Sequence, residues 1–241
     1  MRLRWVALVP LALLSGFGMS DRGEALIGSA LARAHGGYTE EERVAQYGAL
    51  VRTRVAGAFA AANIDYPPKR LAFVAFKDER VLEVYSRASA DAAWQRVLSY
   101  PILGMSGGLG PKTRQGDLQV PEGVYRSEFL NANSRYHLSI RVNYPNADDR
   151  AVAAAEQRDN LGGDIMIHGT TASIGCLAMG NDVAEDLFVL AAGATAESLP
   201  IVIAPVDFRV REYAPPEGAP VWWAERYGAI RAALRQFPIP Q

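Results

Sequence analysis

The first periodic stretch of the chain is helical. Apolar side chains at positions 44, 47, 51, 55, 58 and 59 recur at the spacing of one helix face. Thr39 and Glu42 stand at the spacing of a capping box, and Pro67 with Pro68 closes the pattern. We therefore predict a helix over about residues 39–62 that packs on a core; a spacer from a membrane is the alternative.

Beyond the two prolines the pattern is that of strands. LAFVAF (71–76), the polar break KDER and VLEVYS (81–86) predict a hairpin. Residues 94–100 are ambiguous, whereas 123–129 and 136–142 predict two more strands. In the last of these His137 alternates with apolar neighbours, so we expect a solvated side chain on the face opposite to theirs.

The second half of the chain mixes short strands and helices. A brief apolar run, Ile165 to Ile167, predicts a buried strand that delivers His168 at its tip. Asp182 and Glu185 have capping spacing for a helix that Gly193 ends. Two further elements are expected, a strand over 200–205 and an amphipathic, packed C-terminal helix over 221–237.

The N-terminus predicts export. Arg2 and Arg4 precede an apolar run over residues 5–19, which is short for a membrane span and typical of a signal-peptide core. We therefore expect a protein of the periplasm or cell envelope, with an uncleaved N-terminal anchor as the alternative. A normal globular composition and 25 basic against 26 acidic residues indicate no nucleic-acid partner.

One short stretch combines two rare residues. DIMIHGTTASIGCLAMG (164–180) contains the only cysteine and one of three histidines. A thiol acts as a nucleophile only as thiolate, so it needs a base, and a histidine at a strand end can serve across a short turn. The spacing alone leaves a buried, inert Cys176 and a reactive one equally open.

The glycines around this pair favour catalysis. Gly175 lets main-chain N–H groups approach a substrate oxygen, so the amides of Gly175 and Cys176 are candidates for an oxyanion hole. Gly169 offers a carbonyl that can orient the His168 imidazole. One Cys and one His, even with Asp164, fall short of a zinc site, so we expect neither a metal nor a cofactor.

The sequence resembles the L,D-transpeptidases with a YkuD-type catalytic domain, and within them the YafK-like branch. Four stretches carry the resemblance over about residues 68–206: IMIHG (165–169), SIGCLAM (173–179), GPKTRQGDLQVPEGVY (110–125) and NYPNADDR (143–150). It implies an α+β fold, predominantly β, a YkuD-like β-rich catalytic domain with flanking N- and C-terminal helices. It also implies peptidoglycan stem peptides as substrate.

The resemblance implies a role for each matched residue. Cys176 is expected to be the nucleophile that forms a thioester, His168 the base, and Gly175, Gly169 and Ser173 the oxyanion and orienting residues. Ile174 and Leu177–Met179 stand where most of the wider family has His and Arg, so the ligand of the substrate carboxylate is open. Candidates for substrate binding are Lys112, Arg114, Tyr144, Asn146 and Arg150.

The expected domain organisation has four parts. Residues 1–20 are a signal peptide or anchor, 21–66 a connector and helix, 67–206 the catalytic domain, and 207–241 a C-terminal helical tail.

Other functions stay open beside the transpeptidase. A hydrolase with the same Cys–His pair is one alternative, for example one that cleaves the link between peptidoglycan and a lipoprotein. A non-catalytic cell-wall binding module is another, and a thiol redox sensor is a third. A reactive thiol of low pKa favours the enzyme, and an inert one the binding module.

Overall fold

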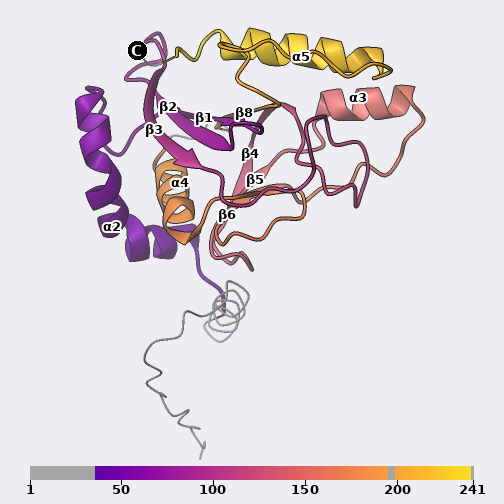
Figure 1. Cartoon of the computed structure of the whole chain (residues 1–241). Helices are drawn as coiled ribbons and strands as arrows, with labels where there is room; N and C mark the ends of the chain where they lie inside the picture. Colours follow the sequence, from indigo (N-terminus) through magenta and orange to yellow (C-terminus); the bar gives the residue numbers. More distant parts are fainter. Residues whose placement is uncertain (1–35, 195–198, 240–241) are drawn as a thin grey trace, which may run out of the picture.

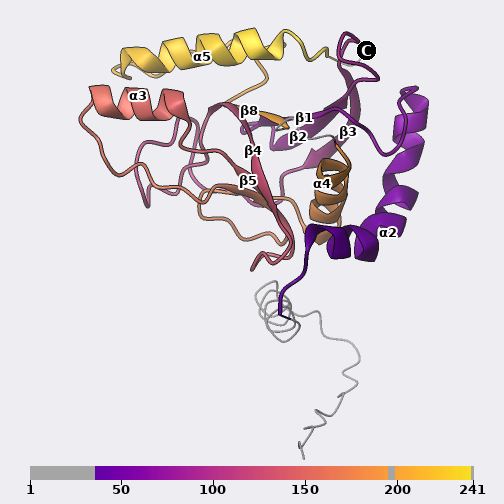
Figure 2. The same cartoon turned by 180° about the vertical axis from the view of Figure 1, so that it is seen from behind.

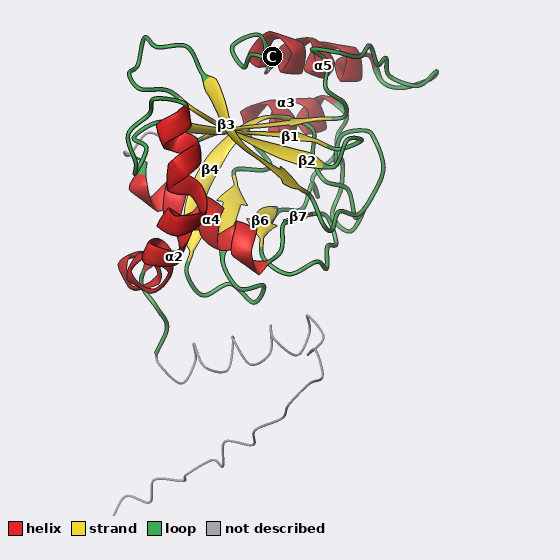
Figure 3. Ribbon diagram, turned by 60° about the vertical axis from the view of Figure 1, so that its left-hand side comes forward, coloured by secondary structure: helices red, strands yellow, loops and turns green. Residues whose placement is uncertain are grey.

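A single curled sheet carries the fold. The computed structural model describes residues 36–194 and 199–239. The eight strands in these ranges lie in the order β3-β2-β1-β8-β4-β5-β6-β7, and helices pack beside the sheet (Figure 3). Most neighbours are antiparallel, but β1 pairs in parallel with β8, and β6 with β7. The strands are β1 (Leu71–Phe76), β2 (Val81–Ser86), β3 (Gln95–Pro101), β4 (Gly123–Asn131), β5 (Ser139–Val142), β6 (Met166–His168), β7 (Leu177–Ala178) and β8 (Pro200–Ala204).

Helices cover the sheet on two sides. α2 (Glu40–Ala61) packs against α4 (Asn181–Gly193), while α3 (Ala147–Ala155) and α5 (Val221–Leu234) lie side by side at another edge (Figures 1 and 2). This mixed α+β architecture with helices at both ends confirms the predicted fold class. The residues of the expected signal peptide lie outside the described ranges, and no described helix is long and apolar enough to cross a membrane.

Strand β1 shows why its sequence is apolar at every position. Phe73 and Ala75 face the large core beneath α2 and α4. Val74 and Phe76 face a second core, which α5 closes with Tyr227 and other side chains. Because both faces are covered, all six residues of LAFVAF are buried, as is usual for a strand inside a layered sheet.

A fully buried ion pair fixes the long loop between β3 and β4. Lys77 follows β1 directly, and its Nζ lies 2.9 Å from Oε1 of Glu122, with both side chains inaccessible to solvent. Nζ also donates to the carbonyls of Gly110 and Val120 at 3.1 and 2.9 Å. Glu122 accepts the Gly110 amide and the Tyr227 hydroxyl at 2.7 and 2.9 Å. The middle and the C-terminal end of the loop are thereby held to the end of β1 and to α5.

Local signals predict most elements correctly. Thr39 and Glu42 form the expected reciprocal capping box of α2. The expected hairpin is β1–β2, and 165–167 and 200–205 correspond to β6 and β8. The ambiguous segment is strand β3, and two-residue β7, directly after Cys176, carries no periodic signal in the sequence.

Two local predictions are wrong for the same reason. Asp182 and Glu185 do not cap α4, whose N-cap is Gly180 without a side-chain bond. Instead, Glu185 binds Arg54 of α2 at 3.0 Å. His137 is not a solvated strand residue: its φ of +75° turns the chain, and its Nε2 lies 2.9 Å from Oε1 of Glu185. In both cases the side chain binds a partner distant in sequence: Glu185 binds Arg54, and His137 binds Glu185.

Replacing Lys77 by Met is expected to destabilise the fold by about 3–5 kcal/mol, because Glu122 then keeps a buried charge without its counter-ion. Urea unfolding followed by circular dichroism measures the change. The matched control is Arg211→Met, which removes a cation from a pair with Asp78 in which both side chains are almost half exposed. That variant should lose far less stability. Equal losses would contradict the role assigned to the buried pair.

Candidate active site

His168 ends strand β6 and is buried, with 1% of its surface exposed. Its Nδ1 lies 2.5 Å from the carbonyl oxygen of Gly169. Because a carbonyl can only accept a hydrogen bond, Nδ1 carries the proton and the neutral ring keeps its lone pair on Nε2. The ring of Tyr136 covers the imidazole, with 4.8 Å between the ring centroids.

Burial sets the charge of His168. Removal from water lowers the pKa of the imidazole, and the hydrogen bond to Gly169 offsets this only in part. The ring is therefore neutral at neutral pH. A neutral, oriented imidazole is the form that can accept a proton from a nucleophile.

Cys176 immediately precedes β7 and is half-buried. Its Sγ donates to the carbonyl of Asp164 at 3.6 Å. Burial raises the pKa of the thiol, and the negative charge of Asp164 adds to this, while the Met166 amide and the Lys112 charge act in the opposite direction. The net shift is upward, so the free protein holds a thiol and not a thiolate at neutral pH.

The parallel pairing of β6 and β7 brings the two residues together. Ile167 pairs with Leu177 and His168 with Ala178, which places Cys176 beside Met166. Side chains alternate between the faces of a sheet. His168 and Cys176 therefore share one face, two positions apart along the pair, while Ile167 and Leu177 enter the core on the other face.

The turn before Cys176 is held by one hydroxyl. Ser173 Oγ accepts the amides of Gly175 and Cys176 at 3.3 and 3.0 Å and donates to the carbonyl of Cys176 at 2.7 Å. The two amides predicted as oxyanion donors thus bind Ser173 in the free protein. Gly175 has φ +119°, and a Cβ there would come within 3.3 Å of the Gln119 carbonyl.

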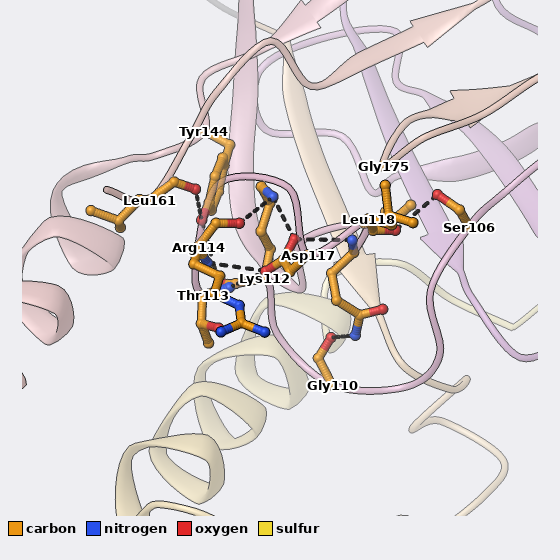
Figure 4. A network of polar contacts seen from close by, with 12 residues as sticks. Ser106, Gly110, Lys112, Thr113, Arg114, Asp117, Leu118, Tyr144, Leu161 and Gly175 are labelled. Carbon is orange, nitrogen blue, oxygen red and sulfur yellow. Dashed lines mark hydrogen bonds and ion pairs between the residues drawn. The ribbon is translucent and has the colours of Figure 1, made fainter. Parts of the chain in front are cut away.

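The long loop forms one wall of this site. Gly104 bridges to Ala178 of β7, and Gln119 lies against Gly175. Within the loop, Asp117 binds Lys112 Nζ at 2.6 Å and accepts the amides of Thr113 and Arg114 (Figure 4). The loop beside the site is therefore braced by its own polar contacts.

Three of the candidate substrate residues have structural partners. Lys112 is 7% exposed and pairs with Asp117. Tyr144 is buried, and its hydroxyl donates to the carbonyls of Lys112 and Leu161 at 3.3 Å (Figure 4). Asn146 is the N-cap of α3. Only Arg114 and Arg150 of this set are exposed. The structure does not bring the five candidates together beside Cys176.

Sequence reasoning misses three groups that surround the pair. Tyr136 stacks on His168, and Asp164 and Met166 contact the thiol through their backbones. Tyr136 was expected inside a strand, but β5 begins only at Ser139. Asp164 and Met166 contact the thiol through backbone groups that every residue type carries, so the sequence could not indicate these contacts. Within the described ranges no cluster of three His, Cys, Asp or Glu side chains is placed to hold a metal ion.

Comparison with known proteins identifies the family. The sequence profile of the YkuD L,D-transpeptidase catalytic domain matches residues 69–210, more than half of the chain. The chain belongs to the YkuD family of L,D-transpeptidase catalytic domains.

The match to curated relatives covers only part of each relative. The protein named "Putative L,D-transpeptidase YafK" of Escherichia coli strain K12 is 41% identical over 129 residues, 53% of this chain and 49% of the relative. The protein of the same name from strain O157:H7 matches equally. The chain thus spans about half the length of the curated relatives it matches.

Two solved structures are similar to part of the chain. The helical cell shape determining protein Pgp2 of Campylobacter jejuni has 22% identity and a TM-score of 0.46, over 57% of this chain and 48% of that one. Bd1075 of Bdellovibrio bacteriovorus has 21% identity and a TM-score of 0.41, over 71% and 56%.

The raised pKa of Cys176 has a measurable consequence. Alkylation by iodoacetamide requires thiolate, so its rate should be low at pH 7 and should keep rising beyond about pH 9, the range of an unperturbed or raised thiol pKa. Stopped incubations at a series of pH values, read by intact mass, give the profile. The protein has one cysteine, so Cys176→Ala is the blank. A plateau reached near neutral pH would overturn the neutral-pair description.

Gly175 is expected to tolerate no side chain. Gly175→Ala should lower stability by about 1–3 kcal/mol, because a residue with a Cβ pays for this backbone conformation. The matched control is Gly57→Ala in the exposed part of α2, where nothing lies within 4 Å of an added Cβ. There the same change should stabilise by about 0.5–1 kcal/mol. Thermal unfolding measures both; an unchanged or higher midpoint for Gly175→Ala would refute the constraint.

Proposed function

We propose that this YkuD domain is an L,D-transpeptidase that passes an acyl group from a peptidoglycan stem peptide through Cys176. The observation that carries the proposal is the contact of His168 Nδ1 with the Gly169 carbonyl, on a strand whose parallel neighbour β7 begins directly after Cys176. In a YkuD domain this arrangement supports general-base catalysis by the imidazole.

The proposed reaction conserves protons at each step. As Sγ of Cys176 attacks the scissile carbonyl carbon, its proton moves to Nε2 of His168. The tetrahedral intermediate collapses, the bond to the leaving amine breaks, and Nε2 returns the proton to that amine. This leaves a thioester on Cys176. An acceptor amine then attacks the thioester and gives its proton to Nε2. The bond between the acyl carbon and Sγ breaks, and Nε2 returns the proton to Sγ, which regenerates the thiol and the neutral imidazole.

The amides of Gly175 and Cys176 are the proposed oxyanion donors. In the free protein they donate to the hydroxyl of Ser173. The oxyanion of the intermediate carries a full charge and is a stronger acceptor than a hydroxyl. We therefore propose that the two amides change partner as the intermediate forms, with Ser173 keeping the turn in place beforehand.

Export and domain organisation belong to the same proposal. Peptidoglycan lies outside the cytoplasmic membrane, and the apolar run over residues 5–19 supports export or N-terminal anchoring. We propose residues 67–206 as the catalytic domain, with 21–66 and 207–241 as the flanking connector-and-helix and helical tail.

Incubation with purified sacculi tests the activity. New crosslinks or exchanged terminal residues, read by mass spectrometry of the digested wall, are expected from the unmodified protein and should be absent with Cys176→Ala. Release of tripeptides, or of a wall-linked lipoprotein fragment, would instead show that water resolves the thioester. No change relative to Cys176→Ala would support a binding module and contradict the proposal.

His168→Ala tests the base. General-base assistance is worth about 10²–10⁴-fold, so formation of the thioester should slow by that factor. The acyl-enzyme is followed as a mass increase of the intact protein. This readout also excludes a redox sensor, which would form no acyl adduct. Near-normal acylation by His168→Ala would refute the proposed mechanism.

A further inference from the structure

A cavity of about 590 Å³ opens beside the active-site face, where β4, β5 and the start of α3 meet. Three of its lining residues are arginines, Arg126, Arg141 and Arg150, and the one acidic lining residue is Glu128. We call this the arginine cavity. Only Arg150 among the three was a candidate from the sequence, because residues 126, 141 and 150 converge only in the folded chain.

Two of the three guanidinium groups lack partners. Arg141 lies 2.7 Å from Glu128 and 2.5 Å from Asp164. In the described part of the chain, the side chains of Arg126 and Arg150 form no ion pair or hydrogen bond, and both are exposed. Like charges that converge on one hollow raise the local potential and favour an anion there.

The start of α3 adds to this potential. Ala147, its first residue, lines the cavity, and the N-terminal end of a helix carries a partial positive charge. The acidic residues of the same turn do not fill the hollow. Asp149 is buried in an ion pair with Arg226, and Asp148 lines a different cavity beside Trp222.

The sheet register sets the separation between the arginine cavity and the thiol. Arg141 pairs with Met166 across β5 and β6, and Cys176 lies beside Met166 on the next strand. Two strand spacings of about 4.8 Å place the Cα atoms of Arg141 and Cys176 about 10 Å apart on one face. An extended peptide advances about 3.3–3.6 Å per residue, so this distance corresponds to two or three residues.

We propose that the arginine cavity binds a carboxylate of the donor peptide. The identification of the donor rests on the proposed function; the preference for an anion rests on the cavity alone. The planar guanidinium groups of Arg126 and Arg150 suit a carboxylate through paired hydrogen bonds. A phosphate group shares this chemistry, and the experiment distinguishes the two.

Binding of amidated peptides tests the proposal. Calorimetric titration of Cys176→Ala protein uses stem tetrapeptides in which one carboxylate at a time is a carboxamide. One amidation should weaken binding about 10-fold or more, the effect of losing hydrogen bonds to a charged group. Adding Arg126→Gln and Arg150→Gln should weaken the unmodified peptide equally and abolish the difference. Arg235→Gln, which replaces an exposed arginine at the end of α5, is the control for the loss of a surface charge outside the cavity and should change nothing.

Each other outcome overturns the proposal. If no amidation weakens binding, or if the double variant keeps the full difference, the carboxylate binds elsewhere. If every amidation weakens peptide binding by the same factor, and inorganic phosphate binds in an Arg150-dependent way, the cavity is a phosphate site. Failure of this inference leaves acyl-enzyme formation intact. Failure of the proposed function instead removes the acyl-enzyme while the carboxylate-dependent binding persists.

Discussion

The buried pair of Lys77 and Glu122 is the constraint on which the arrangement depends. A charge without water must have its counter-ion and further hydrogen bonds, and here the loop between β3 and β4 supplies them through Gly110 and Val120. Burial also lowers the pKa of Lys77, against the opposing charge of Glu122. The loop thus takes one course across the sheet end, and Gln119 reaches the turn that precedes Cys176.

Burial in the folded chain also affects the protonation of His168 and Cys176. The same enclosure that orders the loop removes water from His168 and Cys176, and both become neutral. A neutral pair differs from a thiolate–imidazolium pair, because the nucleophile forms only as the proton transfers. In the proposed mechanism the substrate is therefore seated before the sulfur is activated. That order is compatible with the raised pKa of the Cys176 thiol, whereas a low thiol pKa is the sequence-based expectation for an enzyme.

The sequence predicts those structural features that depend on residues close together along the chain. The capping box of Thr39 and Glu42 lies within one turn, and the apolar runs of β1 and β2 are set by burial, so both are readable. Partners distant in sequence decide the rest. Glu185 has the spacing of a cap but binds Arg54, 131 positions away. His168 and Cys176 could be identified as a candidate pair because they lie close together along the chain. Their catalytic role stays a prediction. The arginine cavity gathers three strand and helix positions and has no local signature.

The protonated thiol of Cys176 also bears on durability. A thiolate attacks peroxides and disulfides far faster than a thiol does. In an oxidising compartment, a lone cysteine with a depressed pKa would be lost to sulfenic acid or mixed disulfides between turnovers. The Asp164 carbonyl and the surrounding protein keep the sulfur protonated. The raised thiol pKa that is expected to slow the reaction with iodoacetamide should in the same way slow the oxidation of Cys176, the only cysteine in the chain.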